Sequence, residues 1–243
     1  FTMGHWSSCA IHGSNALSCW GDATRGQLGE GTVDTNDHAT PLAVSLTNVE
    51  RLALGYFHVC ASHGGGLVSC WGSNGWGETG NGAFSSTPEP TPQTVSGVTT
   101  AIQLAAGQQW SCALLANHTL SCWGDNRNGQ LGDDSTNFHP NATPVPSFDQ
   151  VAQIAAGRKH ACAVKTDGTL WCWGRNDEGQ LGDRTHAEHH VPTQVPGLSG
   201  VRQVACGDVH TCALLDSGAV RCFGSNSDGQ LGDGTNADRS WPS

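Results

Sequence analysis

Lysine is almost missing from the sequence, and basic residues as a whole are scarce. Lys159 and Lys165 are the only lysines in the 243 residues, and 11 basic side chains stand against 21 acidic ones, for a formal net charge of −10 at pH 7. Binding to DNA or RNA needs a basic surface that attracts phosphates. We therefore expect no nucleic-acid partner.

Long apolar runs are also lacking. No stretch approaches the roughly 18 apolar residues of a membrane-spanning helix, so we expect no membrane insertion. No Ser/His/Asp set, paired carboxylates or phosphate-binding loop stands out from the rest of the sequence. We expect a protein that is not an enzyme and has no cofactor. The 33 glycines favour many short strands joined by tight turns.

Cysteine is the most conspicuous residue that is present. The chain has 11 cysteines, and all but Cys206 fall into pairs whose members are separated by the same interval of ten residues. The pairs are Cys9 and Cys19, Cys60 and Cys70, Cys112 and Cys122, Cys162 and Cys172, and Cys212 and Cys222. Such a constant spacing indicates an internal repeat.

The pairs recur about every 50 residues within similar surroundings, which defines repeat units at roughly 1–48, 49–98, 99–148, 149–198 and 199–243. Each unit has a small-residue segment ending in glycine, the cysteine pair, a glycine-rich turn and a proline. The prolines are Pro41, Pro92, Pro144, Pro192 and Pro242. We treat residues 1–243 as one segment built from these repeats.

Each unit is predicted to contain four antiparallel strands. In the fourth unit they are expected at 151–156, 160–165 and 169–174, with the last one after the proline at 193–195, and Thr166-Asp167-Gly168 forms a short hairpin loop. Four strands in about 50 residues are typical of one propeller blade. The fold class is therefore all-β, a β-propeller of about five blades.

Two strings carry a resemblance to a known family. Ala-Gly-x-x-His-x-Cys-Ala at residues 156–163 and Trp-Gly-x-Asn-x-x-Gly-Gln-Leu-Gly at residues 173–182 resemble the regulator of chromosome condensation repeat. The resemblance covers the whole chain and implies a propeller of about seven blades, of which this chain would be a part. Members include a nuclear nucleotide-exchange factor, a plant ultraviolet receptor and a secreted bacterial β-lactamase inhibitor. The cysteine pairs resemble the versions found in exported bacterial proteins.

The cysteine pairs are expected to be disulfides. The hairpin register places Cys162 opposite Cys172, where Cα atoms lie about 4.5–5.5 Å apart. A metal site needs four converging ligands, which two cysteines per blade do not supply. Disulfides persist in oxidising compartments, so we expect a secreted or cell-surface protein. Cys206 takes the place of Ala106 and Ala156 in other units, and we expect it to be a free, buried thiol.

Aromatic and histidine side chains also recur. One large ring per unit is expected to pack between blades, with an aromatic binding site as the alternative. These rings are Trp20, Trp71, Trp123, Trp173 and Phe223. His58, His160 and His210 share one repeat position, and we expect each to bond to the backbone between blades.

The loops before the prolines differ most from unit to unit, at 32–40, 83–91, 135–143, 185–191 and 235–241. Variation within a fixed framework marks a surface that is free to specialise. The candidate binding residues there are Phe84, Phe138, His139, His186, His189, His190 and Trp241. His186 and His190 could instead share a metal ion, although a solvated loop is the simpler interpretation. Asn117 and Asn141 head glycosylation sequons.

The function expected from these features is a secreted or cell-surface interaction module that binds a protein or a glycan through its loops. One alternative is a structural or adhesive subunit of an extracellular assembly, with self-association. A second alternative is a secreted enzyme inhibitor. A competing location for the binding surface is the set of short hairpins, such as Asp167-Gly168, at the other end of the blades.

Overall fold

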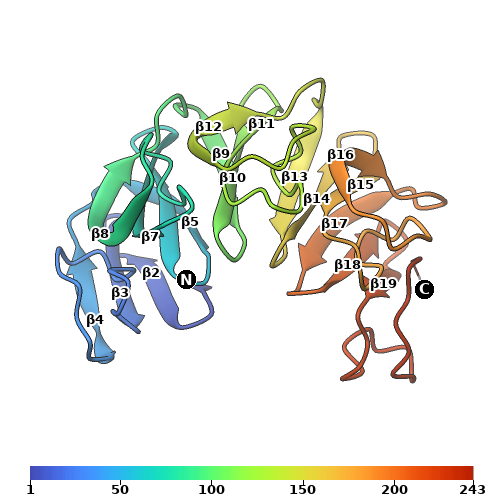
Figure 1. Ribbon diagram of the computed structural model, residues 1–243, viewed down its shortest axis with the longest axis horizontal. Helices are drawn as coiled ribbons and strands as arrows, with labels where there is room; N and C mark the ends of the chain where they lie inside the picture. Colours follow the sequence, from blue (N-terminus) through green and yellow to red (C-terminus); the bar gives the residue numbers. More distant parts are fainter. Residues whose placement is uncertain (243) are drawn as a thin grey trace. The chain divides into compact units, whose positions relative to one another are not determined.

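The computed structural model describes residues 1–242, which form an all-β structure of 19 strands in five sheets, one sheet per repeat. In each sheet the strands are antiparallel and follow one another in chain order (Figure 1). The described residues contain no helix that is long and apolar enough to span a membrane. The propeller fold expected from the repeats is confirmed.

The first three sheets have four strands each. The first consists of β1 (Thr2–Met3), β2 (Ser7–His12), β3 (Ala16–Gly21) and β4 (His38–Val44). The second consists of β5 (Val49–Leu54), β6 (His58–His63), β7 (Leu67–Asn74) and β8 (Ser85–Thr94). The third consists of β9 (Ala101–Ala106), β10 (Trp110–Leu115), β11 (Leu120–Gly124) and β12 (His139–Pro144).

The fourth sheet repeats this plan, and the fifth has three strands among the described residues. The fourth consists of β13 (Val151–Ala156), β14 (His160–Lys165), β15 (Leu170–Gly174) and β16 (His189–Gln194). The fifth consists of β17 (Val201–Cys206), β18 (His210–Leu215) and β19 (Val220–Gly224), and an isolated bridge joins Gly224 to Arg239.

The fourth strand departs from the sequence prediction in the blades that contain it. It was expected after the proline, at 193–195 in the fourth unit, but β16 begins at His189 and contains Pro192. The same holds for Pro41 in β4 and Pro92 in β8. These strands lie at the edge of their sheets, where one side of the backbone has no ladder partner, so a residue without an N–H is tolerated.

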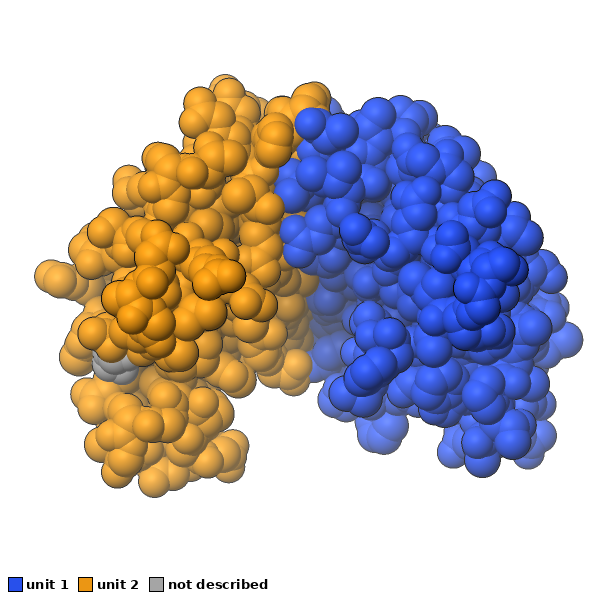
Figure 2. All heavy atoms as spheres, turned by 180° about the vertical axis from the view of Figure 1, so that it is seen from behind, with its two compact units in different colours: residues 1–116, 121–125, 138–144 blue, residues 117–120, 126–137, 145–243 orange. Residues whose placement is uncertain are grey.

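The chain divides into two compact units (Figure 2). Unit 1 comprises Phe1–Ala116, Ser121–Asp125 and Phe138–Pro144, and so holds the first two blades and most of the third. Unit 2 comprises Asn117–Leu120, Asn126–Asn137 and Val145–Ser243, and holds the fourth and fifth blades.

Disulfides join the two central strands of every blade. All five expected pairs are bonded, with Cα atoms 4.1 Å apart in each. Cys162 lies directly opposite Cys172 in the β14–β15 ladder, as the hairpin register requires. The disulfides of the first, second and fourth blades lie in apolar core clusters, because one face of each strand is buried.

The recurrent tryptophans connect neighbouring blades. In unit 1 the indole N–H of Trp71 donates to the carbonyl of Gln27 at 3.0 Å, and that of Trp123 donates to Glu78 at 2.9 Å. In unit 2 the indole of Trp173 donates to Gln130 at 2.9 Å. These three rings are fully buried, which agrees with the core role expected from their register.

The histidines also connect blades, although not in the expected way. His58 Nε2 lies 2.8 Å from the Ser111 hydroxyl and His160 Nε2 lies 2.9 Å from the Thr211 hydroxyl, so the partner is a side chain rather than the backbone. Burial lowers the pKa of His58 to about 4 and that of His160 to about 3. Both imidazoles are therefore neutral at ordinary pH. His210, in contrast, is only half-buried.

A buried asparagine fixes the start of the variable loop in the last four repeats, whereas the first repeat has Ala23 at the matching position. In the fourth blade the side-chain amide of Asn176 donates to Asp183 Oδ1 at 3.1 Å and to the carbonyl of Ala187 at 2.9 Å, and its Oδ1 accepts the Leu181 N–H at 3.0 Å. Asn126 and Asn226 make corresponding bonds in their own turns. The loops thus vary in sequence on a rigid base.

Candidate binding face

The variable loops share one end of each blade with a second set of loops. In the fourth blade His160 pairs with Gly174, and Gly174 pairs with His189, so the first-to-second and third-to-fourth strand connections emerge together. We call this the loop end of a blade. The hairpin between the second and third strands lies at the opposite end, which we call the hairpin end.

Three of the candidate residues lie at loop ends in unit 1. Phe84 is 53% exposed. Phe138 is half-buried and contacts Trp76 edge-to-face, with ring centroids 4.9 Å apart. His139 is the first residue of β12, and its Nδ1 lies 3.2 Å from the Thr143 hydroxyl. Phe84 is therefore the freest of the three to contact a partner.

The candidate histidines of unit 2 are engaged in local structure. His186 is exposed, with Nδ1 3.0 Å from the carbonyl of Asp177. His189 Nε2 lies 2.6 Å from Asp183 Oδ2. His190 packs against Gly129 and lies 3.8 Å from a Glu188 carboxylate oxygen. His189 and His190 belong to β16, so the expectation that both lie in a loop is wrong.

The three potential metal ligands that converge in the described part of the chain lie away from this loop. Among residues 1–242, the group of three potential ligand side chains that converge is His160, Cys162 and Cys206, away from the variable loop. Cys162 is bonded to Cys172, and a disulfide sulfur is not the thiolate that a metal binds.

The last candidate binding residue, Trp241, is 45% exposed, with the Arg239 guanidinium 5.7 Å from its ring centroid.

Sequence reasoning overlooked an aromatic cluster at the loop ends of the first two blades. It comes from the two residues before the recurrent histidine position, His5-Trp6 and Tyr56-Phe57. The His5 and Tyr56 rings stack with centroids 4.4 Å apart, and the His5 and Trp6 rings meet edge-on at 4.7 Å. The signal was present in the sequence, because the same two positions are Gln-Gln, Arg-Lys and Asp-Val in the other repeats.

The cluster borders a pocket of about 570 Å³ in unit 1. Its rings are Trp6, Trp20 and Phe57, and its carboxylates are Asp22 and Asp37. Gly21, His38 and Ala39 complete the lining. Such a combination of aromatic faces and acceptors suits a ligand with an apolar or sugar-like face and hydrogen-bond donors.

Trp20 is the recurrent ring of the first repeat, and the described residues do not test whether it packs against a preceding blade. It is half-buried, whereas Trp71, Trp123 and Trp173 are fully buried. The ring of Trp71 lies against Gly29 in the turn of the first blade, and that of Trp173 lies against Gly132.

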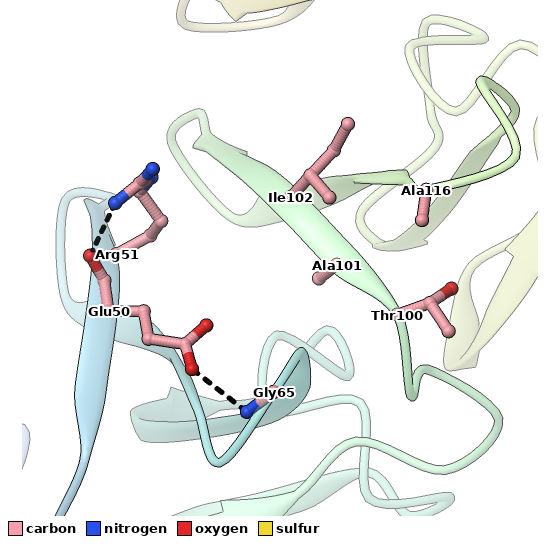
Figure 3. Close-up of a pocket in the computed structure, with 7 residues that line it drawn as sticks. All are labelled: Glu50, Arg51, Gly65, Thr100, Ala101, Ile102 and Ala116. Carbon is pink, nitrogen blue, oxygen red and sulfur yellow. Dashed lines mark hydrogen bonds between the residues drawn. The ribbon is translucent and has the colours of Figure 1, made fainter.

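A second pocket of unit 1, of about 430 Å³, lies at the hairpin end (Figure 3). It is lined by Glu50, Arg51, Gly65, Thr100, Ala101, Ile102 and Ala116. The Glu50 carboxylate already accepts the Gly65 N–H at 2.8 Å, and Arg51 donates to the carbonyl of Glu50 at 2.9 Å. The lining has no aromatic ring, so it offers a ligand less apolar contact than the loop-end pocket.

Four-stranded antiparallel blades with a fixed frame and variable loop ends define a β-propeller domain. The chain belongs to the RCC1-like domain family, whose model matches residues 1–243. The fold is shared with solved structures. Human WBSCR16 has a TM-score of 0.87 at 24% identity, with 99% of this chain and 65% of that chain covered. Yeast RCC1 (Prp20), solved with bound Kap60, has a TM-score of 0.83 at 23% identity, covering 98% and 59%.

Curated relatives match about half of the chain. The X-linked retinitis pigmentosa GTPase regulator of Canis lupus familiaris is 34% identical over 135 residues, which cover 54% of this chain and 13% of the relative. The ultraviolet-B receptor UVR8 of Arabidopsis thaliana is 33% identical over 130 residues, which cover 51% and 29%. The matched part is thus a minor share of each relative's length.

Proposed function

We propose that this chain is a binding module that holds a protein or a glycan at the loop ends of its blades. The observation that carries the proposal is the pocket that Trp6 and Phe57 border at the loop ends of the first two blades, because exposed rings contribute more to interfaces than most other side chains. Phe84 and Trp241 add exposed aromatic surface at other loop ends. The yeast relative that was solved with Kap60 supports a protein as the partner.

The electrostatics favour a neutral or basic partner. The net charge is −10, and Asp22 and Asp37 lie beside the aromatic rings of the pocket. An acidic partner would be repelled during encounter, while a basic one would be attracted. Neutral glycans stack on aromatic faces and donate hydroxyl hydrogen bonds to carboxylates, so they fit the same pocket.

The binding test uses the protein in two parallel captures. The biotinylated chain is applied to a neutral glycan array and to the secreted proteins of its source, and each bound molecule is then titrated against matched variants. Trp6→Ala and Phe57→Ala should weaken binding at least tenfold, in line with aromatic anchors that contribute more than about 1.4 kcal/mol each. The matched controls at the hairpin end, Ile102→Ala and Asp167→Ala, should bind as the unmodified chain does. Loss of binding in the controls alone would overturn the assignment.

We also propose that the protein works outside the cytosol. Five disulfides persist in an oxidising compartment and are reduced in a cytosolic one. Rapid acid quenching of source cells and medium, followed by alkylation of the unfolded protein, should label one thiol per chain, that of Cys206. Labelling of all 11 cysteines would contradict the proposed location.

A further inference from the structure

Cys206 lies beside the disulfide of the preceding blade. The ligand atoms of Cys206, Cys162 and His160 all lie within 4.8 Å of one another. The Thr211 hydroxyl is 3.9 Å from the Cys206 sulfur and 3.7 Å from the Cys162 sulfur, and it donates to the carbonyl of Gln180 at 2.9 Å. Cys206 is half-buried rather than fully buried as expected, and it packs against the core cluster of unit 2.

Unit 1 contains the same arrangement without the thiol. His58 Nε2 lies 2.8 Å from the Ser111 hydroxyl, and the Cys60 sulfur lies 3.5 Å from it. The residue paired with Ser111 across the ladder is Ala106, whereas the residue paired with Thr211 is Cys206. A blade therefore forms the same contacts with alanine at this position, so the Cys206 thiol is not required for them.

We propose that Cys162, Cys172 and Cys206 form a thiol–disulfide exchange site in which Cys206 can displace Cys172 from Cys162. The Cys206 thiolate uses a lone pair to form a bond to the Cys162 sulfur. The electron pair of the Cys162–Cys172 bond leaves on the Cys172 sulfur, which takes up the proton that Cys206 has lost. The number of disulfides is unchanged, so the step needs no oxidant or reductant.

The product differs from the starting state in what the disulfide connects. The Cys162–Cys172 bond joins β14 to β15 within the fourth blade, whereas a Cys162–Cys206 bond joins β14 to β17 of the fifth blade. Exchange therefore replaces an intrablade link by an interblade link in unit 2 and leaves Cys172 as a thiol. The sulfurs lie within 4.8 Å, so side-chain rotation has to close the remaining gap.

The surroundings set the pH at which exchange occurs. Burial raises the pKa of the Cys206 thiol to about 12. His160 is neutral and supplies no positive charge to stabilise a thiolate. The attacking species is the thiolate, so the exchange rate should rise about tenfold per pH unit below the thiol pKa.

The test follows a thiol label from one tryptic peptide to another. The native protein is incubated between about pH 7 and pH 10, quenched in acid, unfolded, and alkylated with N-ethylmaleimide at mildly acidic pH. Trypsin places Cys162, Cys172 and Cys206 on separate peptides, 160–165, 166–175 and 203–221. We expect the label to move from 203–221 to 166–175 as pH rises, while 160–165 becomes linked to 203–221. A label confined to 203–221 after incubation at about pH 10 overturns the proposal.

Two controls separate exchange from unrelated disulfide cleavage. Cys206→Ala, which copies Ala106, should leave Cys172 unlabelled at every pH, and its melting temperature shows that the fold is retained. Cys60 and Cys70, which have no neighbouring thiol of this kind, should stay unlabelled in the unmodified chain. The rate should also be independent of protein concentration, because the attack is intramolecular. Labelling of Cys172 in the Cys206→Ala variant would refute the role of Cys206.

Discussion

Glu78 should reduce the stability of the protein at neutral pH, and replacing it with glutamine should raise that stability. Glu78 occupies a turn position at which the other four repeats have glutamine, and its side chain is fully buried. Its carboxylate accepts the Trp76 N–H at 2.7 Å and the Ser73 hydroxyl at 3.1 Å. Burial raises the pKa of the carboxyl, and the charge of Asp125 adds to the effect.

The sign of the pH dependence follows from proton binding. Between 4.5, the ordinary pKa of a glutamate carboxyl, and the raised pKa in the folded state, the folded chain holds a proton that the unfolded chain has lost. The free energy of unfolding therefore falls as pH rises through this window, by about 1.4 kcal/mol for each unit by which the pKa is raised. Glu78→Gln removes this loss, because an amide does not ionise.

The glutamine variant should also keep the local hydrogen bonds. In the first blade Gln27 Oε1 accepts the Arg25 N–H at 2.8 Å, which is the counterpart of the bond between Trp76 and Glu78. The amide nitrogen of a glutamine at 78 can donate to the Ser73 hydroxyl, which reverses the present bond without leaving either group unpaired. The change in stability should therefore come from the charge.

Thermal unfolding at about pH 4, 5.5 and 7 measures the difference. The melting temperatures should nearly coincide at pH 4, and the Glu78→Gln variant should exceed the unmodified chain at pH 7 by about 2–4 °C per kcal/mol. The control Gln27→Glu introduces a carboxylate at the matching turn of the first blade and should lower the melting temperature at pH 7 but not at pH 4. A difference that does not change with pH would refute the reasoning.

Three further outcomes are expected. Gly132→Ala should lower the free energy of unfolding, measured by urea denaturation, more than Gly232→Ala does. The backbone strain is similar at the two positions, with φ of 76° and 67°, but only at Gly132 does an added Cβ meet Trp173, at 2.8 Å. Equal losses of unfolding free energy in the two variants would argue against a packing cost. Reduction of the five disulfides should lower the melting temperature in calorimetry, since each closes a ten-residue loop worth roughly 3 kcal/mol; an unchanged transition would contradict this. The pKa of His58 is lowered from 6.5 to about 4, so the unfolded chain binds a proton first as pH drops, and the free energy of unfolding should fall by roughly 2–3 kcal/mol through this window. The melting temperature of His58→Gln should therefore approach that of the unmodified chain in acid. A difference between the two melting temperatures that does not change with pH would count against a buried neutral imidazole.

The sequence by itself determined the features that depend on residues close together in the chain. The period of two along a strand and the short hairpin fixed the opposition of Cys162 and Cys172, and the structure has that pair bonded at a Cα separation of 4.1 Å. Three of the four strands of the fourth blade appear at or within one residue of their expected bounds. The exposure of Phe84 could also be anticipated from the sequence, because the loop that carries it is held by residues of its own repeat.

Only the tertiary structure decided what each side chain meets in the next blade. Trp173 is buried because the turn that covers its ring comes from the preceding repeat, about 40 residues earlier in the chain. The bond between His160 and Thr211 and the approach of Cys206 to Cys162 likewise join residues of successive repeats. A repeat pattern specifies the environment that its units share, whereas burial, pKa and reactivity at one position depend on the individual neighbours that packing brings together.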